Sequence, residues 1–328
     1  MTFRSTGLPV GLGLSVLLGA CTGPVSLLQP STPASAPSSA PSPSFASSPA
    51  AITTSVPTCF DNGKGSLRPL GPLPAAGNFP PGSFMKTVFE RGKLVVGVSQ
   101  DTLLFGYLNP ATNQLEGFDI DIAREMSKAI FGDYGHIELK VTSAAQPIAA
   151  LKSGSVDMVA RTFTANCARW KDIDFSTVYY SSGQSLLVLK TSPYRNMQDL
   201  TGKKVCAAAG STSIVNIQRQ SSRPIAVGLP DQSDCLVALQ RGDVDAVSTD
   251  EAVLLGLAAQ DPGVMVVGGR FTDEPYALGI SQAHSEFVRF VNAVLERMRA
   301  DGTWIAIYNK WLSKFGARAT PPPAEYKD

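Results

Sequence analysis

The chain has 328 residues, of which 44% are hydrophobic, enough for one large domain or two moderate ones. Its 28 basic residues balance 27 acidic ones, which argues against nucleic acid or an anionic membrane surface as the main partner. The two histidines, His136 and His284, have no second ligand residue at metal-binding spacing. We therefore expect neither a metal site nor a cofactor.

The first 21 residues have the features of an export signal. One positive charge, at Arg4, precedes an apolar stretch that is too short to span a bilayer. The stretch ends in Leu-Gly-Ala-Cys, which resembles the lipobox of bacterial lipoproteins, where the cysteine is lipidated and becomes the mature N-terminus. A plain signal peptide with a chance cysteine is the alternative, but small residues directly before cysteine favour lipidation of Cys21.

Two segments lack the pattern of a folded domain. Residues 22–58 are rich in Ser, Pro, Ala and Thr and carry no charge, so they cannot bury a core. We expect residues 22–78 to be a disordered tether followed by a lead-in rich in Gly and Pro, and residues 317–328 to be a loose tail.

From Lys93 onward the pattern predicts strands and helices in alternation. The first unit is expected to have strands at 93–98, 137–141 and 155–160, and helices at 118–131 and 148–154. The second unit is expected to have strands at 203–209, 224–228 and 244–249, and helices at 211–220 and 233–242. Each unit reads as βαβαβ, which is typical of α/β folds with parallel sheets.

The two units also share a phrase, ALKSGSVDMVA at 150–160 and ALQRGDVDAVS at 238–248. We therefore predict an α/β protein of two Rossmann-like lobes. Lobe 1 comprises residues 79–179 and 277–316, lobe 2 comprises 184–272, and the chain crosses between them twice. Helices at 285–300 and 301–315 are expected to cover lobe 1.

Four cysteines follow the lipobox: Cys59, Cys167, Cys206 and Cys235. An even number in an exported chain suggests two disulfides, for which three pairings are possible. Cys206 ends a predicted strand and Cys235 opens a helix in the same lobe, so we pair these two and assign Cys59 to Cys167. Buried free thiols are the alternative.

Five segments, in order, resemble one protein family. They are EGFDIDIAREM, ALKSGSVDMVARTFTANCARWKDIDFSTVYY, DLTGKKVCAAAGSTS, VDAVSTDEAVL and DGTWIAIYNKW. Residues 93–315 are similar to the bacterial extracellular solute-binding proteins of family 3, the amino-acid-binding proteins of ABC importers. They are more closely similar to the glutamine- and glutamate-binding lipoproteins of high-GC Gram-positive bacteria. The resemblance implies a type II periplasmic-binding-protein fold whose lobes close over one free amino acid.

The resemblance assigns the ligand's α-carboxylate to both lobes. Arg169 matches the carboxylate-binding arginine of the family, with Thr164 five residues before it. A surface ion pair with a nearby aspartate is the alternative for Arg169. From lobe 2, the family pattern places Ser211, Thr212 and Ser213 at the start of a helix, where donors favour an anion.

The α-ammonium requires a carboxylate, and Asp250 matches the acidic partner of the family, with Thr249 beside it. Asp250 could equally serve as a helix N-cap. Thr162 is expected at the ammonium as well, although a plain strand threonine is the alternative. Tyr276 could close over the ligand from the returning crossover.

Arg161 stands where relatives that bind cationic amino acids have a small hydroxyl residue. It would meet a negative or amide-bearing side chain, unless it points to solvent. Ser99 replaces an acidic residue that is common in the family, which removes repulsion against an acidic ligand. Thr102 and Ala144 replace aromatic residues that clamp the ligand, and Phe105 or Tyr107 are possible substitutes.

We therefore predict a monomeric, lipid-anchored protein outside the cell membrane that captures glutamate or aspartate, or secondly glutamine or asparagine, and presents it to an ABC permease. A ligand-sensing lipoprotein with a membrane signalling partner is the alternative. An enzyme of the cyclohexadienyl or arogenate dehydratase type is a third candidate, but it needs a general acid, and no histidine or unassigned acid falls in the expected site.

Overall fold

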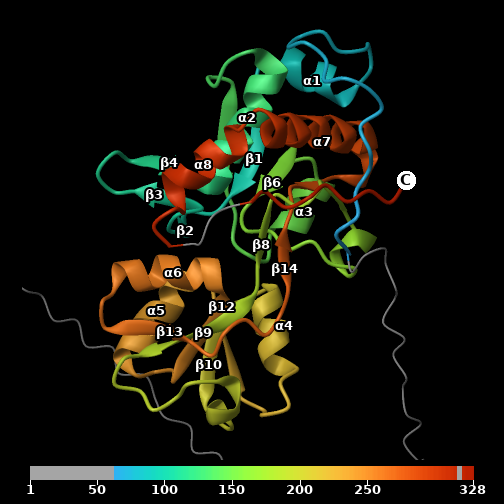
Figure 1. Ribbon diagram of the computed structural model, residues 1–328. Coiled ribbons are helices and arrows are strands. Elements are labelled where there is room, and N and C mark those ends of the chain that lie inside the picture. The colour runs from blue at the N-terminus through green and yellow to red at the C-terminus, as the bar shows by residue number, and fades with distance from the viewer. Residues whose placement is uncertain (1–62, 316–319) are drawn as a thin grey trace, which may run out of the picture. The chain divides into compact units, whose positions relative to one another are not determined.

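The computed structural model describes residues 63–315 and 320–328, which fold into two α/β lobes joined by two crossover segments (Figure 1). Each lobe contains a five-stranded sheet. The predicted fold class is therefore confirmed. Cys21, Cys59 and the tether up to residue 62 lie outside the described residues.

Lobe 1 is built on a sheet of order β5-β1-β6-β15-β7, with β1 parallel to both of its neighbours. Its strands are β1 (Leu94–Val98), β5 (Ile137–Val141), β6 (Met158–Ala160), β7 (Asp174–Phe175) and β15 (Gly279–Ile280). Its helices are α1 (Phe84–Arg91), α2 (Phe118–Phe131), α3 (Pro147–Lys152), α7 (Ser285–Ala300) and α8 (Thr303–Trp311), with the 3-10 helices η2 (Arg169–Lys171) and η4 (Gln282–His284). As predicted, α7 and α8 return to pack on lobe 1 beside α2 (Figure 1).

The boundaries of α2 follow from its sequence. Ile120, Ala123, Met126 and Ile130 recur at helical spacing, and all four are buried in the core of lobe 1. The helix ends at Gly132, whose φ of 93° is readily available to glycine and whose N–H donates to the carbonyl of Lys128.

Lobe 2 has a sheet of order β11-β10-β12-β9-β13, in which β9 and β13 run antiparallel to their neighbours. Its strands are β9 (Gln184–Leu189), β10 (Lys204–Ala208), β11 (Ile225–Leu229), β12 (Ala246–Asp250) and β13 (Val264–Val267). Its helices are α4 (Thr212–Gln218), α5 (Gln232–Arg241), α6 (Glu251–Gln260) and the 3-10 helix η3 (Met197–Leu200). Every strand and helix predicted for the second unit is present.

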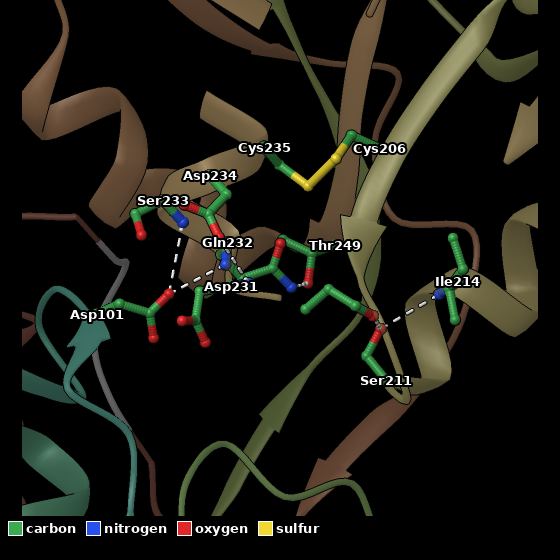
Figure 2. Close-up of a disulfide and its surroundings, with 11 residues drawn as sticks. Asp101, Cys206, Ser211, Ile214, Asp231, Gln232, Ser233, Asp234, Cys235 and Thr249 are labelled. Carbon is green, nitrogen blue, oxygen red and sulfur yellow. Dashed lines mark hydrogen bonds between the residues drawn. A yellow bond between two sulfur atoms is a disulfide. The ribbon is translucent and has the colours of Figure 1, made fainter. Parts of the chain in front are cut away.

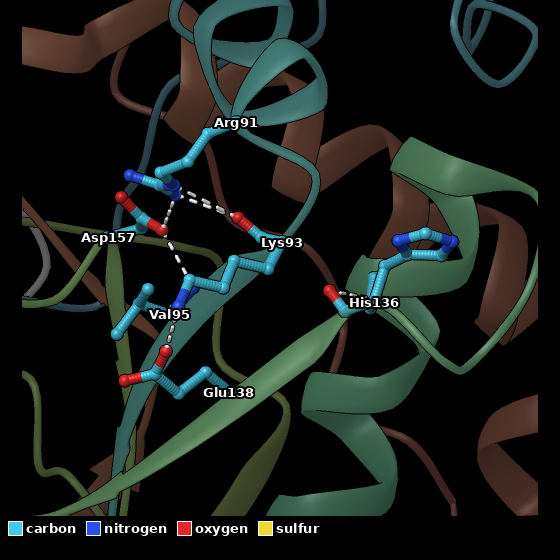
Figure 3. Close-up of polar contacts among 7 residues, drawn as sticks. Arg91, Lys93, Val95, His136, Glu138 and Asp157 are labelled. Carbon is cyan, nitrogen blue, oxygen red and sulfur yellow. Dashed lines mark hydrogen bonds and ion pairs between the residues drawn. The ribbon is translucent and has the colours of Figure 1, made fainter.

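The repeated phrase has the same structural role in both lobes. Asp157 accepts a hydrogen bond from the N–H of Val95 at 2.7 Å, and Asp245 accepts one from the N–H of Lys204 at 2.9 Å. In each lobe the aspartate thus holds the start of a neighbouring parallel strand. Figure 3 shows the lobe 1 version, in which Arg91 also donates to Asp157. The shared aspartate therefore serves the sheet of each lobe.

Two crossover strands form a small antiparallel sheet between the lobes (Figure 1). β8 (Tyr180–Ser182) leads into lobe 2 and β14 (Glu274–Tyr276) leads back, with Tyr180 opposite Tyr276. Because this sheet is separate from both five-stranded sheets, bending at β8 and β14 can move the lobes without disrupting either core.

A hairpin extension of lobe 1 was not anticipated from the sequence. It consists of β2 (Asp101–Thr102), β3 (Gly106–Asn109) and β4 (Gln114–Glu116), which form a three-stranded antiparallel sheet. Both α5 and α6 of lobe 2 contact β2. The hairpin is therefore a point at which the two lobes meet.

The prediction of a loose C-terminal tail is wrong for residues 320–328. Ser66 and Tyr326 form a parallel bridge, and the ammonium of Lys327 lies 3.5 Å from the ring centroid of Trp170. Arg289 forms an ion pair with Asp328 at 2.6 Å. The tail is held because the segment around Ser66 supplies the backbone partners that it lacks by itself.

The same contacts correct the prediction for the last part of the lead-in. The Ser66 hydroxyl is buried and donates to the carbonyl of Phe175 at 2.6 Å, and Trp170 donates to the carbonyl of Gly63 at 2.7 Å. Residues 63–78 are therefore part of lobe 1. In the part of the chain that the structure describes, no helix is long and apolar enough to cross a membrane.

The predicted Cys206–Cys235 disulfide is present and joins β10 to the first turns of α5. With a sequence separation of 29 between the two cysteines, chain-entropy arguments give it about 3–4 kcal/mol of stabilisation. It anchors α5 to the lobe 2 sheet. The pairing of Cys59 with Cys167 stays a prediction, since Cys59 lies outside the described residues.

Candidate functional site

A cavity of about 40 Å³ lies between the lobes, and nine of the predicted ligand-binding residues line it. They are Arg161, Thr162, Thr164, Arg169, Ser211, Thr212, Ser213, Thr249 and Asp250. The cavity is small, so its opposing walls are close enough for one ligand to touch both lobes.

On the lobe 1 side, Arg161 and Thr162 follow directly after β6. Thr162 has a left-handed backbone with φ of 47°, and its N–H donates to the buried carboxylate of Asp119 at 2.6 Å. Tyr179 also donates to Asp119, at 2.7 Å. Asp119 therefore holds the turn that follows β6 and carries Arg161.

Arg169 is oriented by two contacts from its own lobe. Its guanidinium donates to the carbonyl of Thr164 at 2.7 Å and lies 4.3 Å from the ring centroid of Phe163. Burial lowers the pKa of Arg169 to about 10, while the charges of Glu274 and Asp250 oppose this shift. It therefore stays charged at neutral pH, and it lines the cavity.

On the lobe 2 side, three hydroxyls at the start of α4 have separate partners. Ser211 caps the helix by accepting from the N–H of Ile214. Thr212 donates to Glu274 at 3.0 Å, and the hydroxyls of Ser213 and Thr249 lie 3.1 Å apart. These contacts preorganise the wall of lobe 2.

Asp250 ends β12 and is buried, with a relative exposure of 5%. Burial raises its pKa from an ordinary value of 3.8 to about 8, and the charge of nearby Glu274 adds to this rise. Tyr276 donates to one carboxylate oxygen at 2.6 Å. The other oxygen, Oδ1, has no partner among the described residues.

Two predicted ligand residues, Ser99 and Tyr276, are not among the residues that line the described cavity. The Ser99 hydroxyl donates to Asp101 at 2.7 Å, and Tyr276 contacts Asp250. Both lie one layer behind the wall and orient side chains that do line it. The buried ring of Phe105 packs against Tyr276 rather than facing the cavity.

Two acidic residues and one amide that line the cavity were not identified as ligand residues from the sequence: Asp101, Asp231 and Gln232. Asp101, on the lobe 1 hairpin, accepts hydrogen bonds from the N–H groups of Gln232 at 3.0 Å and Ser233 at 3.4 Å. Figure 2 shows these bonds reaching the first turn of α5, which also carries Cys235. Asp101 therefore links the two lobes directly. The sequence does predict a helix N-terminus at α5, and helix N-termini attract carboxylates. This was the signal from which the contact of Asp101 could have been found.

Three buried side-chain atoms that line the cavity have no hydrogen-bond partner within the described residues. They are Nε of Arg161, Oε1 of Gln232 and Oδ1 of Asp250. An unpaired buried polar atom typically costs about 1–3 kcal/mol, so such a cluster indicates a place for an external partner. One donor and two acceptors on these lining residues, which come from both lobes, are thus left without a partner.

The closeness of the lobes depends on two glycines in lobe 2. A Cβ on Gly256 of α6 would lie 2.6 Å from the carbonyl oxygen of Leu103 in lobe 1. A Cβ on Gly210 would lie 2.7 Å from Cα of Ala145. Both contacts involve backbone atoms of the opposite lobe, so a larger residue at either position would hold the lobes apart.

Comparison with known proteins identifies the family. Residues 94–314 match the model of the bacterial extracellular solute-binding proteins, family 3. The chain belongs to this family. Its members are binding proteins, so the dehydratase alternative is not supported, and the family is extracellular.

Individual relatives agree with this assignment. The ABC transporter glutamine-binding protein GlnH of Bacillus subtilis is 37% identical over 70% of this chain and 85% of its own length. The glutamate-binding protein GluB of Corynebacterium efficiens is 32% identical over 71% of this chain and 83% of its own. A solved structure of an ancestral arginine-binding protein bound to glutamine is 35% identical, with a TM-score of 0.64, and covers 68% of this chain and 98% of that chain.

Gly256→Ala should weaken solute binding without destabilising the folded protein. Alanine is favoured over glycine inside a helix by about 1 kcal/mol, so the unliganded protein should be as stable as the wild type or more stable. Closure would be opposed by a strain of about 1–3 kcal/mol, which corresponds to roughly 5- to 150-fold weaker solute binding. Thermal unfolding and calorimetric titration measure the two effects.

Gly71→Ala is the matched control, because a Cβ there would have nothing within 4 Å. It should leave solute affinity unchanged. Full affinity in Gly256→Ala would contradict the conclusion that this contact sets the closed position of the lobes.

Proposed function

We propose that this protein is a lipid-anchored, extracytoplasmic carrier that captures a polar amino acid by hinge closure and presents it to an ABC permease. The observation that carries the proposal is the cluster of unpartnered atoms on Arg161, Gln232 and Asp250 around one cavity. The relatives GlnH and GluB are a glutamine-binding and a glutamate-binding protein, which supports the same ligand class.

The groups of a free amino acid match the two sides of the cavity. Asp250 supplies an unpaired carboxylate oxygen for the α-ammonium. Arg169, already oriented by Thr164 and Phe163, supplies a guanidinium for the α-carboxylate. Arg161 then faces the polar end of the ligand side chain. The ligand would thereby bridge residues from both lobes, so its binding free energy would favour the closed form.

Hinge closure has a structural basis in the crossover strands. β8 and β14 form a two-stranded sheet of their own, and β14 is also bridged to Thr164 of lobe 1. Tyr276 and Glu274 of β14 contact the cavity-lining Asp250 and Thr212. Ligand contacts and the hinge are thus connected through single hydrogen bonds. A permease would recognise the closed arrangement of the lobes.

A thermal-shift screen over the common amino acids tests the proposal. Glutamine, glutamate, asparagine or aspartate at 100 times its Kd should add about 2.7 kcal/mol to stability. Arg169→Ala should weaken binding of every amino acid alike, because all of them share the α-carboxylate. Stabilisation by none of the amino acids would contradict the proposed ligand class.

Ligand binding should release a proton. Because burial between the lobes raises the pKa of Asp250 to about 8, the described arrangement without ligand holds this proton at pH 6.5, and the ligand's ammonium favours the ionised carboxylate. Calorimetry at pH 6.5 in buffers of different ionisation enthalpy should show release approaching one proton per ligand, and affinity should rise with pH up to about 8.

The same shift has a consequence for the unliganded protein. The unfolded chain loses this proton near pH 4 and the folded chain near pH 8, so the Asp250 contribution lowers stability as pH rises between these values. Asp250→Asn should remove both this slope and the proton release. Proton release that persists in Asp250→Asn would assign the titrating group elsewhere.

The anchoring part of the proposal rests on Cys21, which lies outside the described residues. Cys21→Ala should release the exported protein from the membrane fraction while leaving amino-acid binding intact, since one lipid attachment is the anchor we propose. Fractionation followed by immunoblotting measures this. Unchanged membrane retention would show that Cys21 is not the anchor.

A further inference from the structure

One end of the cavity is formed by four polar residues, two from each lobe. Lobe 1 supplies Asp101 and Arg161, and lobe 2 supplies Asp231 and Gln232. Asp101 connects them, because it accepts the N–H of Gln232 and is the carboxylate whose charge acts most strongly on Arg161. This end therefore takes shape only when the lobes are together.

The orientation of the Gln232 amide is set by lobe 2. Its NH₂ group donates to the hydroxyl of Thr249 at 3.0 Å, and that hydroxyl also lies 3.1 Å from the hydroxyl of Ser213 (Figure 2 shows Gln232 and Thr249). The carbonyl oxygen Oε1 of Gln232 is left buried without a partner in the described part of the chain. Gln232 therefore presents an acceptor to the cavity.

Arg161 presents the complementary donor, since its Nε is also buried and unpartnered. Burial lowers the pKa of Arg161, and the carboxylates of Asp101, Asp231 and Asp119 oppose this shift. Two of these carboxylates, Asp101 and Asp231, line the same cavity. These carboxylates act against the positive charge of Arg161 without forming an ion pair with it in the described residues, so a ligand carboxylate would meet opposing charges at this end of the cavity.

A side-chain carboxamide matches this pair of groups. Its carbonyl oxygen can accept from Nε of Arg161, and its NH₂ can donate to Oε1 of Gln232. A carboxylate offers only acceptors, so it would leave Oε1 of Gln232 unpaired and would add a third negative charge beside Asp101 and Asp231. A cationic side chain offers only donors, so it would leave Nε of Arg161 unpaired.

We infer that Gln232 is a specificity-determining residue, and that with Arg161 it makes this site prefer a carboxamide side chain, as in glutamine or asparagine, over the corresponding acid. The inference rests on the proposed function, since it concerns the far end of the same amino-acid site. It reverses the order of preference that the sequence suggested, because the sequence does not reveal the carboxylates around Arg161.

Titration calorimetry of glutamine and glutamate, with arginine as a cationic comparison, tests the inference on three variants. The wild type should bind glutamine at least tenfold more tightly than glutamate, and arginine more weakly than glutamine. Gln232→Met keeps the length of the side chain and removes the acceptor, so glutamine should lose roughly 2- to 12-fold in affinity while glutamate loses less. The ratio of the two affinities should therefore fall.

Gln232→Glu keeps an acceptor and adds a negative charge, so it should raise the ratio of glutamine to glutamate affinity. Gln198→Glu introduces the same charge at an exposed position of lobe 2 and should leave the ratio unchanged. The unfolding temperatures of the unliganded variants report whether each one is folded.

Two results would overturn the assignment of Gln232 while leaving the proposed function intact. One is a wild type that binds glutamate as tightly as glutamine. The other is a ratio in Gln232→Met and Gln232→Glu that equals that of Gln198→Glu. A wild type that binds no amino acid would instead overturn the proposed function and this assignment together.

Discussion

When the lobes are closed, three polar side-chain atoms of the cleft are buried without a hydrogen-bond partner in the described residues. Nε of Arg161, Oε1 of Gln232 and Oδ1 of Asp250 belong to residues of both lobes that line one cavity. Each would be hydrated if the lobes were apart, so closing without a ligand carries a desolvation penalty. A ligand that pairs all three removes that penalty. Ligand affinity, ligand selectivity and closure of the lobes therefore depend on the same set of contacts.

The two lobes hold the starts of their sheet strands in the same way, but they present different side chains at the cleft. Asp157 and Asp245 hold equivalent strand starts, which the repeated phrase reflects. Beyond those strands, lobe 1 presents Arg161 and Arg169, whereas lobe 2 presents Asp250 with a row of hydroxyls. A zwitterionic ligand suits this division, since each lobe offers mainly one sign of charge. The crossover strand β14 touches both sides through Tyr276 and Glu274.

Most of the candidate site could be predicted because its residues lie in short motifs next to strand ends. Arg161, Thr164 and Arg169 follow β6, and Asp250 ends β12, so local order alone places them at the cleft. Ser99 and Tyr276 do not line the described cavity, since distance from a cavity depends on side-chain direction, which the sequence does not give. Gln232 was missed because its unpaired oxygen results from a bond to Thr249, 17 residues away.

The sequence by itself determined the α/β class, the two lobes, the strands and helices of each unit, and the Cys206–Cys235 disulfide. These depend on local periodicity and on residues that are close in the chain. Only the tertiary structure decided the docking of the tail on Ser66, the contact of Asp101 with α5, and the balance of charge around Arg161. The reason is physical: these features join segments far apart in sequence, and burial and pairing have meaning only after those segments meet.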